Sequence, residues 1–154
     1  MSYKILCLGK TKEDWIRQGI TEYQKRLEAV WKMQLVELGD VSLKIAGSIN
    51  KVKSKEAVII QKALLPGDFV FALDEHGSQH TSNAFALNLD EISTTRDIVF
   101  VIGGVYGLDK SVLERADEIL SFSRFTYPHQ LIRIILMEQL YRAWTIRSGK
   151  TYHY

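Results

Sequence analysis

The sequence predicts an α/β fold in which helices flank a mostly parallel sheet. Short β-rich runs alternate with segments of helical periodicity along the 154-residue chain, which is the pattern of consecutive βα units. The chain length and a hydrophobic content of 46% are sufficient to bury one core. We therefore expect a single domain over residues 1–154.

Five runs are expected to form the strands, and the last of them has the weakest pattern. They are Tyr3 to Leu8, Met33 to Leu38, Phe69 to Asp74, Ile98 to Ile102 and Glu118 to Phe122. The lone cysteine, Cys7, lies in the first run and is expected to pack as a small hydrophobe. No intrachain disulfide can form, which fits a reducing cytosol.

The first helix is predicted between the first two strands, with its cap at Thr11 and Asp14 three residues later. Its apolar residues recur at helical spacing, at Ile16, Ile20, Tyr23, Leu27 and Val30. Two shorter helices are predicted from Thr81 to Ile92 and from Asp109 to Ala116, each opening at a capping residue.

Another helix is predicted over Lys51 to Leu65, ending at Pro66-Gly67. Its inward-facing residues are expected to be Val58, Ile59, Ala63 and Leu64. Its first turns carry Lys51, Lys53 and Lys55, which are interpreted as a solvated helix start, with phosphate contact as the alternative.

The last helix, from Pro128 to Arg147, has apolar residues on nearly every side. Such a helix is buried at the centre of a fold or in a subunit interface, and we expect both here, which implies a homodimer. Glu138 and Arg142 are four residues apart and are expected to pair on one face. The opposite face is expected to gather His129, Arg133 and Arg147.

Two loops leave predicted strands and enter predicted helices, at Gly103-Gly104-Val-Tyr-Gly107 and at Leu120 to Pro128. A third strand is expected to end at Asp74, before a turn at Gly77. Because the carboxyl ends of parallel strands meet at one edge, these loops are expected to form a ligand cleft there. Taken alone, the glycine turn is a weak signal and is better interpreted as a plain tight turn.

Positive charge is concentrated in the last 34 residues, which hold five Lys or Arg residues and one acid, Glu138, in a chain of net charge +2. This distribution favours a phosphate-bearing partner. No apolar run is long enough to cross a bilayer, and a cytoplasmic protein is expected. His76 and His80 lack a clear third ligand, so no metal is expected.

Several ordered motifs carry a family resemblance. They are Phe100-Val-Ile-Gly-Gly-Val-Tyr-Gly-Leu108, Leu120-Ser-Phe-Ser, Thr126-Tyr-Pro-His-Gln-Leu-Ile-Arg133, Glu138-Gln-Leu-Tyr-Arg-Ala-Trp144 and Tyr152-His153. Together they resemble the ribosomal RNA large subunit methyltransferase H family of SPOUT methyltransferases. The resemblance implies a C-terminal trefoil knot, a homodimer, and methyl transfer from S-adenosylmethionine to N3 of a pseudouridine in 23S rRNA of the assembled ribosome.

The resemblance also implies roles for individual residues. The cofactor would contact Leu73, Gly103, Phe122, Ser123, Arg124, Phe125, Thr126 and Tyr127. The acceptor side would use Arg142, Tyr152 and His153, with His153 as the general base and stacking on RNA as the alternative for Tyr152. RNA contacts would come from His129, Arg133, Arg147 and Lys150, with a capped, structural histidine as the equal alternative for His129. Two alternatives are a noncatalytic ribosome-associated RNA-binding module and a small enzyme that binds a nucleotide phosphate at Gly103-Gly104.

Overall fold

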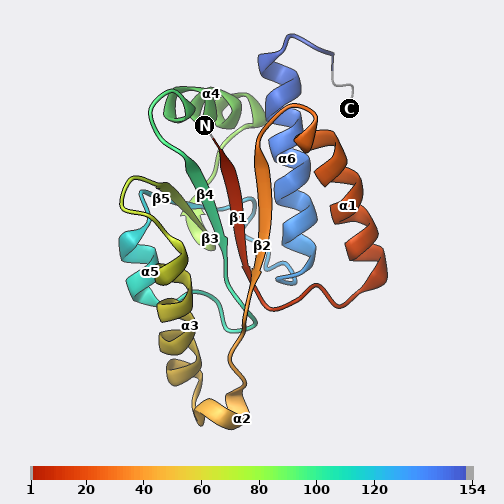
Figure 1. The fold of residues 1–154 in the computed structure, drawn as a ribbon. Helices are drawn as coiled ribbons and strands as arrows, with labels where there is room; N and C mark the ends of the chain where they lie inside the picture. Colours follow the sequence, from red (N-terminus) through yellow and green to blue (C-terminus); the bar gives the residue numbers. More distant parts are fainter. Residues whose placement is uncertain (1, 152–154) are drawn as a thin grey trace.

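The computed structural model of the protein describes residues 2–151 and has the predicted α/β architecture (Figure 1). Its elements are β1 (Tyr3–Leu8), α1 (Asp14–Glu28), β2 (Met33–Leu38), α2 (Leu43–Ala46), α3 (Ile49–Ala63), β3 (Phe69–Ser78), α4 (Ser82–Ser93), β4 (Ile98–Ile102), α5 (Lys110–Arg115), β5 (Glu118–Leu120) and α6 (Leu131–Arg147). The five strands form one sheet in the order β2-β1-β4-β3-β5, and every pairing is parallel. The carboxyl ends of all strands therefore meet at one edge.

Two predicted strand ends were wrong. β5 stops at Leu120, and β3 continues to Ser78 through Gly77, where a turn was expected. A Cβ atom on Gly77 would lie 2.5 Å from the carbonyl oxygen of Ile119. This glycine therefore allows β3 and β5 to approach each other closely, and its role is packing within the sheet.

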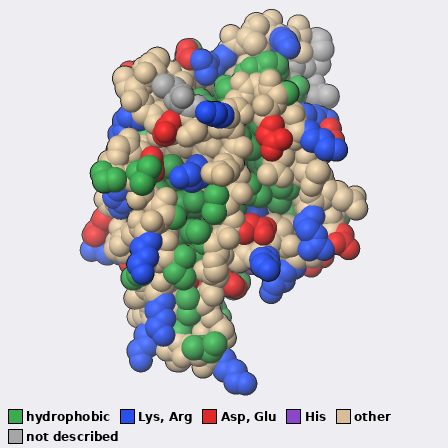
Figure 2. Space-filling model, in the orientation of Figure 1, with side chains coloured by type: hydrophobic (Ala, Val, Ile, Leu, Met, Phe, Trp, Pro, Cys, Tyr) green, Lys and Arg blue, Asp and Glu red, His purple; other side chains and the backbone are tan. Residues whose placement is uncertain are grey.

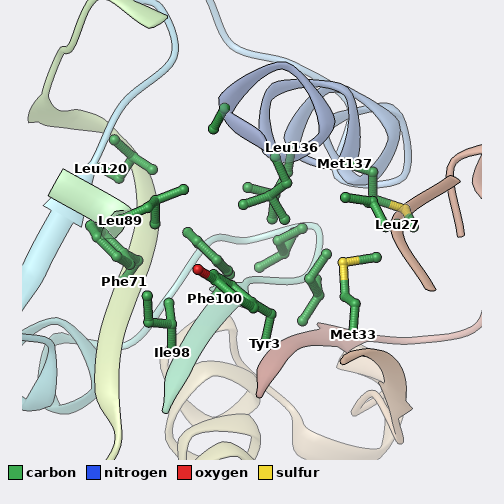
Figure 3. Close-up of a cluster of buried hydrophobic side chains, with 14 of the residues drawn as sticks. Tyr3, Leu27, Met33, Phe71, Leu89, Ile98, Phe100, Leu120, Leu136 and Met137 are labelled. Carbon is green, nitrogen blue, oxygen red and sulfur yellow. The ribbon is translucent and has the colours of Figure 1, made fainter. Parts of the chain in front are cut away.

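Helices α1, α4 and α6 cover one face of the sheet, and α3 with α5 covers the other. The larger core lies under α6, where Leu136 and Met137 pack above Phe71 and Phe100 (Figure 3). The rings of Phe71 and Phe100 stack with centroids 5.0 Å apart. Cys7 is buried in this core as expected, and burial raises the pKa of its thiol to about 12, so it is a poor nucleophile.

The caps of α4 and α5 are confirmed. The Thr81 hydroxyl accepts from the backbone N–H of Ala84, and the Asp109 carboxylate accepts from that of Ser111. The predicted cap at Thr11 was wrong, because the residue before α1 is Glu13 and makes no side-chain cap bond. The Thr11 hydroxyl instead donates to the carboxylate of Glu37 on β2.

The predicted inward face of α3 was only partly right, because Ala63 and Leu64 pack against the core whereas Val58 does not. Its buried residues are Val52, Glu56, Ala57 and Ile60, and Val58 is 50% exposed. The helix is rotated because it buries a glutamate, which an apolar pattern cannot identify. The short α2 was not predicted at all.

Helix α6 begins at Leu131, so that Pro128 lies before its first turn. It lies in the groove between α1 and α4 (Figure 1). Gly19 of α1 admits this close packing, since a Cβ there would lie 2.8 Å from the side chain of Ile134. No helix within residues 2–151 has the length and hydropathy to span a membrane.

Candidate functional site

A cavity of about 700 Å³ opens at the carboxyl edge of the sheet. Its walls are the C-terminal half of β3, the chain segments that follow β4 and β5, the beginning of α6, and Lys53 on α3. Its apolar lining includes Ile102, Leu108, Leu120 and Ile132. Both volume and position suit a small organic ligand bound at the edge of a parallel sheet.

The structure brings together all the sequence-predicted cofactor residues except Arg124. Leu73, Gly103, Phe122, Ser123, Phe125, Thr126 and Tyr127 line the cavity. The side chain of Arg124 is exposed and lies outside this lining. The predicted cleft therefore exists.

The turn after β4 forms a thin wall of the cavity. The backbone of Gly104 pairs with that of Gly107, which has a φ of +76° that favours glycine. A Cβ atom on Gly103 would lie 3.0 Å from the carbonyl carbon of Gly107 and 3.1 Å from the backbone nitrogen of Leu108. Glycine at 103 thus allows the turn to fold back tightly.

The segment after β5 forms the opposite wall. The Ser121 hydroxyl donates to the carbonyl of Ser123 at 2.9 Å, and the backbone N–H of Phe125 donates to the Ser123 hydroxyl at 3.0 Å. The Thr126 hydroxyl donates to the carboxylate of Glu75 at the end of β3. These bonds hold the segment over the cavity, where Phe125 is 80% exposed.

Four charged or titratable residues of the lining were not predicted: Lys53, Asp74, Glu75 and His76. The backbone and ring nitrogens of His76 lie 2.9 Å from the carboxylate of Asp74. The signal for Asp74, Glu75 and His76 in the sequence was their place directly after the apolar part of β3, whereas Lys53 comes from α3. The cavity therefore offers both signs of charge around an apolar interior.

His129 lines the cavity where the chain enters α6. Burial lowers the pKa of its imidazole, the positive charges of Arg133 and Lys12 lower it further, and Asp40 opposes them. At neutral pH His129 is consequently uncharged. Its predicted contact with RNA would therefore be a neutral hydrogen bond or a stacking contact.

Glu56 supports the cavity from behind the turn after β4. It is 4% exposed, and its Oε1 atom accepts from the backbone N–H of Val41 at 3.1 Å. Its buried Oε2 atom has no hydrogen-bond partner among the described residues and lies 3.3 Å from where a Cβ of Gly104 would be. Burial raises the pKa of the Glu56 carboxyl, the Val41 N–H opposes this shift, and Asp40 adds to it.

We expect Glu56→Gln to stabilise the protein relative to wild type increasingly as pH rises from 5 to 8. A raised carboxyl pKa means that stability is greatest while Glu56 is neutral and falls as pH rises through its folded-state pKa. Urea unfolding at both pH values measures the difference. Glu114→Gln on α5 is the matched control, because Glu114 is 63% exposed. An equal difference at both pH values would contradict the expectation.

Arg133, a predicted RNA contact, is completely buried. Its guanidinium donates to the carbonyls of Leu8 and Gly9 at 2.8 and 3.0 Å and to the Thr11 hydroxyl at 2.8 Å. It also forms an ion pair with Glu37 at 3.3 Å. Burial opposes ionisation of Glu37, but bonds from Thr11 and the charge of Arg133 hold its pKa below the ordinary value. In this arrangement Arg133 joins α6 to the end of β1 and does not present its charge to a phosphate.

The other basic residues of the tail are also engaged within the protein. Arg147 forms an ion pair with Asp90 on α4, and the Lys150 ammonium lies 4.5 Å from the centroid of the Trp144 ring. Arg133 and Arg147 therefore reach different elements near opposite ends of α6, and do not form one patch with His129. Both Arg147 and Lys150 remain predicted RNA contacts, because the residues themselves are exposed.

The predicted pair of Glu138 and Arg142 is confirmed. Arg142 donates through Nε and Nη2 to Oε1 of Glu138, at 3.0 and 2.6 Å, and both side chains are 20% exposed. Arg142 does not line the cavity. The two other predicted acceptor-side residues, Tyr152 and His153, lie outside the described residues.

His76, in the last part of β3, and His80, between β3 and α4, each contact an acid. His76 bonds to Asp74, and His80 bonds to Glu118 on β5. Within residues 2–151 there is no cluster of three side chains able to hold a metal ion.

Comparison with known proteins gives a consistent family. A family model described as "Predicted SPOUT methyltransferase" matches residues 1–153. The chain is 47% identical to the ribosomal RNA large subunit methyltransferase H of Pelotomaculum thermopropionicum, over 97% of each chain. It is 44% and 42% identical to the proteins of the same name from Lactiplantibacillus plantarum and Exiguobacterium sp., in each case over 99% of both chains. The chain therefore belongs to the SPOUT methyltransferase family, whose enzymes use S-adenosylmethionine.

Proposed function

We propose that this protein methylates 23S rRNA of the large ribosomal subunit, at N3 of a pseudouridine and within the assembled ribosome. The observation that carries this proposal is the identity of 42–47% with ribosomal RNA large subunit methyltransferases H over nearly the whole chain. The cavity at the carboxyl edge provides a compatible site. Cytoplasmic localisation follows from the same proposal, because the bacterial ribosome is a cytoplasmic particle.

The residues of the cavity fit S-adenosylmethionine. The volume of about 700 Å³ lies in the range for ligands of this size, and Ile102, Leu108 and Leu120 supply apolar surface for an adenine. Glu75 supplies negative charge for the donor's cationic groups, and Lys53 supplies positive charge for its carboxylate. When bound, the cofactor would supply an electrophilic methyl group. The protein's own task is to align the acceptor nitrogen and to assist the loss of its proton.

The acceptor side requires groups that the cavity of one protomer does not contain. Arg142 lies ten residues further along α6 than Ile132, which lines the cavity, and a helical rise of about 1.5 Å per residue separates them by about 15 Å. We therefore place Arg142 at the cavity of a second copy, where it would hold the base and stabilise negative charge on N3. Tyr152 and His153, which lie outside the described residues, are proposed to act on the same side.

The surface of α6 supports such a homodimer. Leu131, Ile135, Glu138 and Arg142 follow one another at spacings of four, three and four residues and thus share one face. All four are only partly buried within the protomer. A second copy packed on this stripe would cover its apolar residues and bring Arg142 toward the partner's cavity.

The trefoil knot also remains a proposal. Leu120 ends β5 at one edge of the sheet, whereas Gln130 accepts a 2.9 Å hydrogen bond from the backbone N–H of Lys12, just after β1. The segment between them must cross the sheet edge beside the turn after β4. Such a crossing is compatible with threading of the C-terminal segment, and an end-to-end trace in a crystal structure would test it.

Transfer to ribosomes provides the decisive test. The protein is incubated with methyl-labelled S-adenosylmethionine and 70S ribosomes from a strain that lacks this methylation, and the labelled nucleotide is located. We expect label at one pseudouridine of 23S rRNA. Cofactor binding without any label would support the alternative of a noncatalytic RNA-binding module.

A further inference from the structure

We propose that residues 41–55, here named the basic arm, form a phosphate-contacting surface for ribosomal RNA. The inference rests on the proposed function and names a part of the partner's binding surface that the C-terminal tail does not supply. The basic arm comprises the segment after β2, the short α2 and the first half of α3. It contains Lys44, Lys51, Lys53 and Lys55 and no Asp or Glu.

The lysines of the basic arm have the exposure that phosphate contact requires. Lys44, Lys51 and Lys55 are exposed, and within the described residues none of them forms an ion pair with a carboxylate. Lys51 and Lys55 are four residues apart on α3 and therefore share one face. Adjacent cations of one sign repel each other, and an anionic partner removes that repulsion.

The basic arm lies next to the proposed catalytic site. Helix α2 and the start of α3 extend beyond the carboxyl edge of the sheet, the edge at which the cavity opens (Figure 1). Figure 2 shows Lys and Arg side chains along this lower end of the molecule. Lys53 lines the cavity itself, so the arm leads from the cavity wall outward to Lys44. RNA whose base enters the cavity would have its backbone within reach of these lysines.

The basic arm is held in place by specific bonds. The Glu56 carboxylate accepts the backbone N–H of Val41 where the arm begins, and the Ser48 hydroxyl accepts that of Lys51 at the start of α3. Val52 is 1% exposed and fixes the first turns of α3 to the rest of the protein. The lysines are thus presented from an ordered support, which reduces the entropy lost on binding.

Three of the residues first predicted to contact RNA offer little free positive charge to phosphates, so another basic surface is required. Arg133 is buried, Arg147 is paired with Asp90, and His129 is uncharged at neutral pH. Affinity for RNA depends chiefly on cations that neutralise phosphates and release counterions. Among the described residues, the lysines of the basic arm meet this requirement beside the cavity.

The test compares two triple variants of the full chain in binding to 70S ribosomes over a range of salt concentrations. Lys44→Ala, Lys51→Ala and Lys55→Ala are combined in the arm variant. The control combines Lys25→Ala, Lys32→Ala and Lys62→Ala, which removes three exposed lysines away from the arm: at the end of α1, before β2 and in the last turn of α3. Both variants lose the same charge. Lys53 is left intact because it lines the proposed cofactor cavity.

We expect the arm variant to bind ribosomes about tenfold more weakly than the control, with a log–log salt slope shallower by up to about 2.7. Affinity for S-adenosylmethionine should be equal in both. Equal ribosome affinity of the two variants would overturn the proposal. So would a loss of affinity caused by Ile45→Ala but not by the arm variant, because Ile45 is 80% exposed and would then indicate an apolar protein partner.

The ribosome-binding experiment tests the basic arm independently of the proposed methyltransferase activity. Arm-dependent binding to ribosomes without methyl transfer by the wild type would support the RNA surface and contradict the enzymatic activity. Methyl transfer to 23S rRNA with unchanged affinity of the arm variant would support the activity and contradict the surface.

Discussion

Replacing Arg133 with alanine is expected to lower the free energy of unfolding by about 3 kcal/mol or more. The side chain is fully buried, and its removal leaves the carbonyls of Leu8 and Gly9 without these donors. It also leaves Glu37 without its cationic partner and opens a cavity beneath α6. Urea unfolding at pH 7 measures the loss.

Two further variants separate the polar loss from the cavity. Arg133→Met fills much of the volume without any hydrogen bond, so it should recover only the packing component. Adding Glu37→Gln to Arg133→Met should cost less than the sum of the two single changes, because the carboxylate is then no longer unpaired. A loss of less than about 1 kcal/mol in the free energy of unfolding for Arg133→Ala would mean that Arg133 has no such structural role. If the folded Arg133→Met variant retains its ribosome affinity, the buried Arg133 makes no contact with RNA.

Much of the fold could be predicted because it depends on local patterns. The alternation of apolar runs and helical segments identified all the strands, and the caps at Thr81 and Asp109 fixed the starts of α4 and α5. The site followed from topology, since the C-terminal half of β3 and the segments after β4 and β5 meet at one edge of a parallel sheet. Gly103 and the segment from Phe122 to Tyr127 could therefore be placed in one cleft from the sequence.

Three of the errors arose where a polar side chain is buried by a tertiary contact. Arg133 lies four residues after His129 in a basic tail, and only the packing of α6 over the end of β1 reveals that the protein supplies its acceptors. Glu56 caused a similar error on α3, because the buried face of that helix contains a carboxylate that the periodic pattern assigns to solvent. Thr11 resembles a helix cap in the sequence, yet its hydroxyl bonds to Glu37 on another element. Residues distant in sequence supply the partners of all three side chains.

Replacing Arg142 with alanine is expected to lower kcat for methyl transfer by about 10² to 10³. The proposed role of Arg142 is to stabilise charge that develops on N3, an interaction made in the transition state, so the affinity for S-adenosylmethionine should remain near that of the wild type. Single-turnover transfer to ribosomes and equilibrium binding of the cofactor measure the two quantities. Glu138→Gln is the matched control, because it weakens the ion pair with Arg142 and leaves the arginine in place. Equal loss of kcat in both variants would indicate that the pair acts only on structure.

Mixing two inactive variants tests whether Arg142 acts on the partner's cavity. Gly103→Val should abolish cofactor binding, since even a Cβ at this position would lie 3.0 Å from the backbone of Gly107. In a mixed dimer, the Arg142→Ala protomer retains an intact cavity, and the Gly103→Val protomer retains Arg142. One complete site then forms if the two groups come from different protomers, so activity should reappear after unfolding and refolding the variants together. If both groups came from the same protomer, every site in the mixed dimer would lack one of them, and the mixture would stay inactive. The position of Arg142, about 15 Å along α6 from the cavity wall, favours the first outcome.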